Sequence, residues 1–429
     1  MCNWLSFMKF LFLPLLFLST YANAETNSGD TAWILASSSL VLFMTLPGLA
    51  LFYAGLVQSK NVVSVLCQHF GIACAMSILW VVLGYSLAFS GGDSGLIGNL
   101  DKMFLHSAKD GLVGTIPEIL FVVFQMTFAV ITPALIIGCY VERINFSAVL
   151  IFSSLWLLAV YCPTAFWIWG GGFLAELGVK DFAGGIVVHT TAGVAALVIA
   201  IVIGKRVNFS KDMLSPPHNP VLSMIGACML WVGWFGFNGG SALAADSTAS
   251  MAILVTHIAA SLGAFSWIVI EWIRFGKPTL VGMVTGMVAG LATITPASGF
   301  VGVEGALILG VGGGILCYFI VDLIRLKLKI DDSLDVFAVH GVGGILGTIL
   351  CACLMSENMG GVGYDEGLTM MAQLKVQIYS VAVAVIWTAV ITYVILRITG
   401  LFVALRVDEE DETDGLDKSL HGETGYNNL

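Results

Sequence analysis

Two histidines lie in strongly apolar parts of the sequence, and each has the same pattern of neighbours. In DFAGGIVVHTTAG, Asp181 stands eight residues before His189, and in DSLDVFAVHGVGG, Asp332 stands eight residues before His340. A glycine follows each histidine by four residues. Ionisable groups inside a membrane are costly to bury and mark functional sites. The repeated spacing predicts that His189 and His340 are equivalent positions of an internal repeat.

A pair of imidazoles inside a membrane can serve as a metal site, a proton relay, a hydrogen-bonded structural pair or the polar lining of a pore. Zinc sites use three or four protein ligands, and neither motif supplies a third buried His, Cys or carboxylate. We therefore expect no metal and no other cofactor. The pattern favours a pore lining in which imidazoles donate and accept hydrogen bonds and relay protons, and the structural pair stays open as the alternative.

Aromatic residues form a second group, predicted near the outer ends of the apolar segments. Rings at membrane surfaces ordinarily anchor a protein among lipids. Here a serine adds an oxygen that accepts hydrogen bonds, and ring faces attract a dehydrated cation by about 2 kcal/mol. A charge at mid-membrane costs about 2.5 to 17 kcal/mol, so a small cation with protons to lose gains by shedding one before it goes deeper. The group comprises Phe124, Phe128, Trp169, Trp234, Phe237 and Ser241.

Membrane-spanning helices must position these residues. The chain has 429 residues, of which 58% are hydrophobic and only 11% charged. This composition excludes a soluble protein of this length, and the lack of alternation excludes a transmembrane barrel. We predict an all-α polytopic membrane protein with eleven segments of the length that a bilayer needs: 31–57, 62–89, 115–140, 146–168, 184–204, 220–241, 249–273, 279–298, 302–325, 335–355 and 371–399.

The positive charges orient these segments. With the mature N-terminus outside, 13 lysines and arginines fall on the cytoplasmic side and four on the outer side, while Lys9 completes the 18 in the chain. Cytoplasmic loops carry such an excess. The two histidine motifs then run in opposite senses, which predicts an inverted repeat of five plus five segments. The substrate path is expected between the halves, and the eleventh segment lies outside the repeat.

Three regions are predicted along the chain. Residues 1–24 contain Lys9, an apolar run and a small-residue end, the form of a cleavable signal peptide; an uncleaved extra span is the alternative. Residues 25–406 form the transmembrane domain, and 407–429 form an acidic cytoplasmic tail. The net charge of −10 leaves no basic surface for nucleic acid.

Taken together, the motifs resemble the bacterial branch of the Amt/Mep/Rh family of ammonium transporters. The resemblance covers nearly the whole mature chain and is carried by LVLFMTLPGLALFYAGLV, DFAGGIVVH, WVGWFGFNGGS, TPASGF and DVFAVHGVGGILG. It implies a homotrimer in the bacterial inner membrane, in which each protomer has its own pore for ammonium, ammonia or the analogue methylammonium. The tail segment GLDKSLHGETGYN is similar to family tails that accompany regulation by a PII protein of the GlnK type.

The resemblance also implies residue roles. Asp181 would be structural beside the recruitment site. The outer ammonium site would consist of Trp169, Phe128 and Ser241, the gate of Phe128 and Phe237, and the pore lining of His189, His340 and Trp234, beside which we place Phe124.

Three alternatives stay open. A passive gas channel of Rhesus type is disfavoured by Trp169 and Ser241, which relatives of that type generally lack. An ammonium sensor would use the same pore-like fold. An intramembrane enzyme is disfavoured because no nucleophile–base pair or complete metal set accompanies the histidines, and we expect no catalysis.

Overall fold

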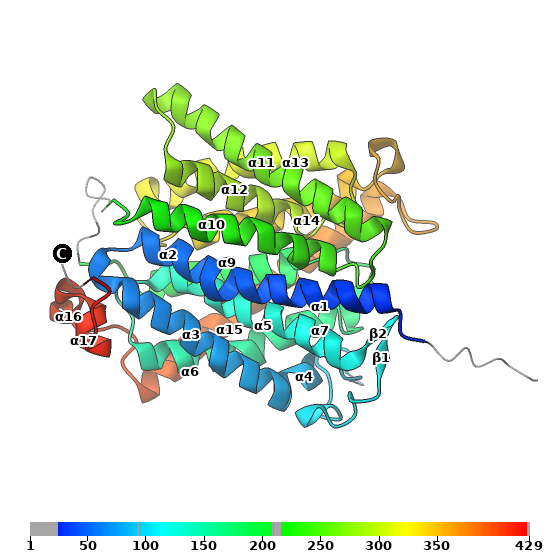
Figure 1. The fold of residues 1–429 in the computed structure, drawn as a ribbon, viewed down its shortest axis with the longest axis horizontal. Helices are drawn as coiled ribbons and strands as arrows, with labels where there is room; N and C mark the ends of the chain where they lie inside the picture. Colours follow the sequence, from blue (N-terminus) through cyan, green and yellow to red (C-terminus); the bar gives the residue numbers. More distant parts are fainter. Residues whose placement is uncertain (1–24, 93, 208, 210–215, 427–429) are drawn as a thin grey trace, which may run out of the picture.

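The computed structural model describes residues 25–92, 94–207, 209 and 216–426. Within these residues the chain forms a bundle of helices that run roughly along one common direction (Figure 1). The predicted signal peptide, residues 1–24, lies outside the described residues. The bundle confirms the predicted all-α architecture of a multi-pass membrane protein.

The two ends of the bundle are structurally distinct (Figure 1). One end carries the C-terminal helices, and we call it the tail face: α16 (Glu409–Asp414) and α17 (Leu416–His421). The opposite face carries the start of the first helix and a short antiparallel hairpin of β1 (Leu112–Val113) and β2 (Ile116–Pro117).

Ten helices of the described part of the chain are long and apolar enough to cross a membrane. The eighth expected segment, 279–298, is instead a shorter helix, α12 (Leu280–Ile294), of 15 residues. At 1.5 Å per residue it is about 22 Å long, because residues 295–300 leave the helix in turns. The ten longer spans are Ser28–Leu56, Ser59–Phe89, Glu118–Tyr140, Phe146–Glu176, Gly185–Ile203, Pro220–Gly239, Ser247–Phe275, Val303–Lys327, Phe337–Leu354 and Met370–Phe402.

Most of these spans combine α-helical parts with single π-helical turns. The α-helices of the first half are α1 (Ser28–Phe43), α2 (Ala50–Leu56), α3 (Val62–Leu79), α4 (Tyr85–Phe89), α5 (Glu118–Tyr140), α6 (Phe146–Trp156), α7 (Cys162–Ile168), α8 (Phe173–Glu176) and α9 (Thr191–Ile203). Those of the second half, besides α12, are α10 (Pro220–Trp234), α11 (Ser247–Phe275), α13 (Val303–Asp322), α14 (Val342–Leu354) and α15 (Met370–Phe402).

Three of the seven π-helical turns in the described residues contain predicted site residues. π-Turns occur frequently at functional sites, because the extra residue disturbs the regular ladder. Two of them contain the histidines, and a third contains Phe237. The π-turns are η1 (Met44–Leu49), η3 (Trp80–Gly84), η5 (Leu157–Tyr161), η6 (Gly185–Thr190), η7 (Phe235–Gly239), η8 (Leu323–Lys327) and η9 (Phe337–Gly341); the short 3₁₀ turns are η2 (Ser59–Asn61), η4 (Met103–Leu105) and η10 (Glu357–Met359).

Glycines bring the helices of each histidine motif close together. A Cβ atom added to Gly193 would lie 2.2 Å from the Cα atom of Gly341. A Cβ atom added to Gly344 would lie 2.5 Å from the carbonyl oxygen of Gly185 and 2.9 Å from the Cβ atom of His189. Small residues permit such close approach between helices in membranes. The glycine four residues after each histidine therefore allows the two motifs to cross.

Candidate functional site

The part of the site nearest the face opposite the tail is built around Trp169, which ends helix α7. We call this part, formed by Trp169, Phe128 and Ser241, the cup. The indole Nε1–H of Trp169 donates a hydrogen bond of 2.8 Å to the carbonyl oxygen of Asp181. The ring meets Phe128 of α5 edge to face, with 5.9 Å between ring centroids and 85° between planes. Ser241 follows η7, and its Oγ–H donates to the carbonyl oxygen of Phe237 at 2.8 Å. The oxygen lone pairs of Ser241 therefore remain free to accept from a ligand.

Below this cup, two phenylalanine rings close the path. Phe128 and Phe237 are both 1% exposed, and their ring centroids are 4.3 Å apart with 31° between planes. Phe124 supports Phe128 from one turn away, with 5.0 Å between centroids. Carbon atoms in contact are separated by about 3.5–4.0 Å, so no molecule fits between the two rings as they stand.

The two histidines lie directly beneath the phenylalanine pair. Their Nδ1 atoms are 3.2 Å apart, and both side chains are buried. One Nδ1 must therefore donate and the other accept, which gives the two rings different tautomers. His189 also stacks on Trp234 at 5.5 Å and on Phe237 at 6.0 Å between centroids. The indole of Trp234 is held by a 2.9 Å hydrogen bond to the hydroxyl of Thr295.

Two hollows meet at His340. The inner one is an apolar void of about 10 Å³, lined by both histidines, Trp234 and Phe237 among other side chains. This volume holds about one water molecule. The second is a cavity of about 240 Å³ toward the tail face, which we call the vestibule; apolar and polar side chains line it, and the polar ones include Glu142 and Arg206. His340 thus separates the narrow apolar void from the wider vestibule.

Asp181 starts the helix that carries His189. Its carboxylate accepts four backbone hydrogen bonds, from Gly184 at 2.9 Å, Gly185 at 2.6 Å, Ile186 at 2.8 Å and Val187 at 3.1 Å. Burial raises the pKa of Asp181, and the four N–H donors act against that rise. Since a carboxylate has about four acceptor sites, these bonds occupy it fully. The geometry supports a structural role and not direct ligation.

Asp332 occupies the same place in the second motif but makes fewer contacts. Its Oδ2 atom accepts from the backbone N–H of Phe337 at 2.7 Å. Burial and the charge of Asp335 raise the pKa of Asp332 to about 7. Asp335 itself pairs with Arg325 at 2.6 Å. Burial raises the pKa of Asp335 to about 6, and the arginine acts in the opposite direction.

Comparisons with known proteins agree with this geometry. The family model described as the Ammonium Transporter Family matches residues 32–426. The chain belongs to the ammonium transporter family.

Relatives in this family cover almost the whole chain. An ammonium transporter of *Aquifex aeolicus* is 44% identical over 427 residues, which cover 98% of this chain and 99% of the relative. A putative ammonium transporter of *Methanothermobacter thermautotrophicus* is 46% identical over 408 residues, or 93% of this chain and 98% of the relative. An ammonium transporter of *Bacillus subtilis* is 45% identical over 403 residues, with 93% and 98% covered.

Solved structures of the family share the fold. The crystal structure of Mep2 from *Saccharomyces cerevisiae* matches with a TM-score of 0.83 and 35% identity, and the match covers 90% of this chain and 89% of that one. A structure described as a sensor Amt protein matches with a TM-score of 0.85 and 30% identity, covering 91% and 97%. The family and its relatives support ammonium transport as the function.

The predicted site residues are thus brought together in this ammonium transporter. Seven rings form one column, and Ser241 stands one turn from Phe237 at its outer end. No cluster of three or more His, Cys, Asp or Glu side chains that suits a metal ion occurs in the part of the chain that the structure describes. The column contains Trp169, Phe128, Phe124, Phe237, Trp234, His189 and His340.

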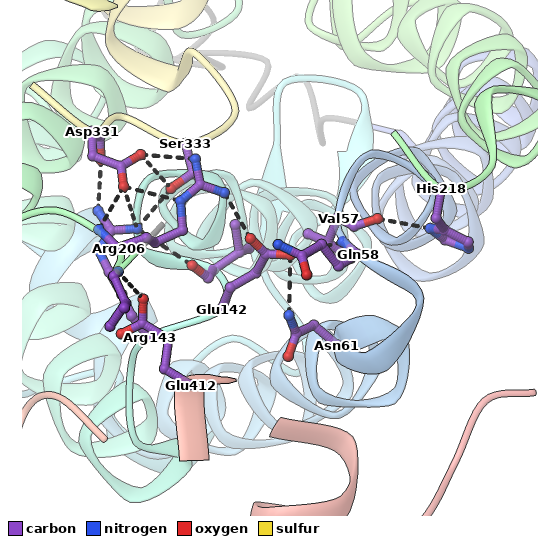
Figure 2. A network of polar contacts seen from close by, with 12 residues as sticks. Val57, Gln58, Asn61, Glu142, Arg143, Arg206, His218, Asp331, Ser333 and Glu412 are labelled. Atoms are coloured by element: carbon purple, nitrogen blue, oxygen red, sulfur yellow. Dashed lines mark hydrogen bonds and ion pairs between the residues drawn. The ribbon is translucent and has the colours of Figure 1, made fainter. Parts of the chain in front are cut away.

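The motif analysis missed a charged network beside the vestibule, which Figure 2 shows. Arg206 donates to the carboxylate of Glu142 at 2.7 Å and to both oxygens of Asp331 at 3.0 Å. Arg143 donates to the carbonyl oxygen of Asp331 at 2.6 Å and to the hydroxyl of Ser333 at 2.7 Å. The pKa of Asp331 lies below its ordinary value, because the two arginines outweigh the effect of burial. The signal in the sequence was the adjacent charges of Glu142 and Arg143 at the end of an apolar run.

The tail is joined to the same face of this ammonium transporter. The carboxylate of Glu412 accepts from Arg406 at 2.6 Å and from the backbone N–H of Val207 at 2.5 Å. The carboxylate of Asp417 accepts from the backbone N–H of Ser64 at 2.8 Å, at the start of α3. Because Glu412 also lines the vestibule, the tail forms part of the wall of that cavity.

Proposed function

We propose that the chain recruits ammonium at the cup of Trp169, Phe128 and Ser241, removes a proton at the phenylalanine gate, and conducts ammonia past His189 and His340. The ring faces would attract the cation, and the serine oxygen would accept one of its hydrogen bonds. The observation that carries this proposal is the closed, dry column of rings between the cup and the vestibule.

The column favours the neutral base for an energetic reason. A charge taken into the middle of a membrane costs several kcal/mol even on the lowest estimates, and the void beside the histidines holds about one water molecule to offset it. Ammonia carries no charge and needs only hydrogen-bond partners, which the two imidazoles supply. The proton either returns to the outer side or crosses by a separate route.

We further propose that α12 completes a set of eleven spans, arranged as an inverted five-plus-five repeat with α15 outside it. The distribution of 13 lysines and arginines against four supports an outer N-terminus and a cytoplasmic tail, in the bacterial inner membrane. The assembly is a homotrimer with one pore in each protomer. Native mass spectrometry of the purified protein tests the assembly, and a monomer or dimer contradicts it.

We also propose that a PII protein of the GlnK type binds at the tail face and regulates transport. The support is the position of the tail, whose Glu412 lines the vestibule. Deletion after Val407 is expected to abolish PII capture by the purified transporter. A truncated protein that captures PII as well as the full chain does refutes a required role of the tail.

The transport mechanism is tested by charge movement in proteoliposomes after an ammonium concentration jump. A sustained current in the wild type, lost on His189→Ala or His340→Ala, supports net charge transfer through the histidine pair. Internal alkalinisation without current indicates neutral conduction, with the proton left outside. If active wild-type protein shows neither a current nor internal alkalinisation, the proposal is contradicted.

The recruitment site is tested separately with Trp169→Leu. Removal of the ring face is expected to weaken attraction by about 0.5–2 kcal/mol, a roughly 2- to 30-fold rise in the half-saturating ammonium concentration. Assembly should be unchanged, because the ring is only partly buried. An unchanged concentration dependence overturns this assignment.

A further inference from the structure

Two glutamines of α15 are fully buried in a largely apolar helix. Gln373 and Gln377 are both 0% exposed and stand four residues apart, so they share one helix face. A buried amide is costly unless it forms hydrogen bonds. Their partners therefore indicate what these residues do.

Both side chains bind the backbone of the segment just before Asp181. The Oε1 atom of Gln377 accepts from the N–H of Lys180 at 2.8 Å, and its Nε2 atom donates to the carbonyl oxygen of Lys180 at 2.7 Å and to that of Thr348 at 2.9 Å. Gln373 donates to the carbonyl oxygen of Gly178 at 3.0 Å and to Oε1 of Gln377 at 3.2 Å. Gln377 thus satisfies both backbone polar groups of Lys180.

Lys180, whose backbone Gln377 holds, is adjacent to Asp181, which orients the ring of Trp169. The carbonyl oxygen of Asp181 accepts the indole hydrogen bond of Trp169, and its carboxylate starts the helix of His189. A displacement of Lys180 therefore moves the acceptor that fixes the indole ring. Among the described residues, no other side chain forms a hydrogen bond with the backbone of Lys180.

We propose that Gln377, assisted by Gln373, is a positioning residue for the outer ammonium site. It holds the backbone of Lys180 and Asp181, and through Asp181 it sets the orientation of the Trp169 ring face toward the cation. This inference rests on the proposed recruitment role of Trp169. It also gives a function to α15, the span outside the predicted repeat.

The test is a double-mutant cycle of Gln377→Met and Trp169→Leu in proteoliposomes, read out as ammonium-induced current or, for neutral conduction, as the initial rate of internal alkalinisation. Gln377→Met alone is expected to raise the half-saturating concentration roughly two- to tenfold while the maximal transport rate stays within roughly twofold of wild type. In the Trp169→Leu background the same change should add nothing further, because the ring it positions is gone.

Asp365→Asn is the matched control. It removes the 2.7 Å ion pair of the Lys180 side chain and leaves both backbone bonds to Gln377 in place. Its half-saturating concentration should equal that of wild type, and an increase as large as that of Gln377→Met contradicts a role of the backbone clamp.

The outcomes distinguish a failure of the positioning role of Gln377 from a failure of the recruitment role of Trp169. If Trp169→Leu weakens half-saturation but Gln377→Met does not, or if the two effects simply multiply, the positioning role is overturned and the recruitment site stands. If Trp169→Leu has no effect, both fail. If Gln377→Met does not accumulate, Gln373→Met replaces it in the test, because that variant loses the bond to Gly178. It is expected to raise the half-saturating concentration by a smaller factor. An unchanged half-saturating concentration overturns the inference.

Discussion

The Asp181–His189 and Asp332–His340 motifs are two versions of one local structure. In each, the third residue after the aspartate has a positive φ, 110° at Gly184 and 61° at Asp335. A π-helical turn follows and carries the histidine. The versions differ in the aspartate, which accepts four backbone hydrogen bonds in the first motif. In the second motif it accepts one, from the N–H of Phe337, and has a weaker interaction with the backbone of Val336.

The two motifs thus share one backbone geometry but have different side-chain contacts. The first motif lies beside the aromatic cup, and its aspartate is occupied by the helix start, which makes that segment rigid. The second borders the vestibule, where Asp332 is close to a second acid, Asp335, and to Arg325. The shared geometry positions the histidines, and the unshared contacts set how firmly each is held and how it responds to pH.

Loss of either histidine should have the largest effect on transport. His189→Ala is expected to reduce selective ammonium current roughly tenfold or more, because it removes a buried hydrogen-bond partner and the ring stacked on Trp234 and Phe237. His340→Ala should cause a smaller loss, since that ring borders the vestibule. Currents with ammonium and with potassium measure both flux and selectivity. Wild-type flux and selectivity in His189→Ala would reduce the pair to a structural role.

Replacement of the two aspartates should reduce the stability of the protein to different extents. In Asp181→Asn, about two buried N–H donors would face the amide NH₂ group and lose their acceptor. Each unsatisfied donor is expected to reduce the free energy of unfolding by about 1–3 kcal/mol. Asp332→Asn disturbs one such bond. Thermal unfolding of the detergent-solubilised proteins should therefore show a much larger drop in midpoint for Asp181→Asn. Equal drops contradict the difference in capping.

Changes at the positive-φ positions should have intermediate effects. Gly184→Ala is expected to cost about 1–3 kcal/mol, because the new Cβ atom would lie 2.6 Å from Cγ2 of Val188. Asp335→Asn should cost less, since asparagine also tolerates the left-handed region and the ion pair that it loses with Arg325 is partly exposed to solvent. The same unfolding assay ranks the two variants, and the reverse order contradicts the shared backbone geometry.

The smallest effect is a dependence on pH. The pKa of Asp332 is raised to about 7, so the folded protein binds a proton there that the unfolded chain releases near pH 4. This contribution to stability is present at low pH and is lost as the pH rises through 7. Asp332→Asn, which cannot ionise, should therefore compare with wild type more favourably at pH 8 than at pH 6.5, by about 0.8 kcal/mol. A constant difference between the two pH values contradicts the raised pKa.

The sequence was sufficient to predict the helical membrane fold and the residues that form the column. Hydrophobic length marks spans, and the spacing of Asp181 and His189 repeats in the second motif. The π-turns were not predictable, because packing against neighbouring helices selects them and no local residue pattern does. The clamp by Gln377 and the network around Arg206 were missed for a related reason. Their partners lie in segments far apart in sequence, and only the folded chain joins them.

The dry column also bears on how cells conserve energy. A membrane that stores a proton gradient loses that store through any continuous file of water, because protons hop along hydrogen-bonded chains. Between the Phe128–Phe237 pair and His340 the protein encloses a void of about 10 Å³, enough for about one water molecule. A void of this size has no room for a file of water molecules. A column built in this way would let the transporter reside in an energised membrane without acting as a short circuit.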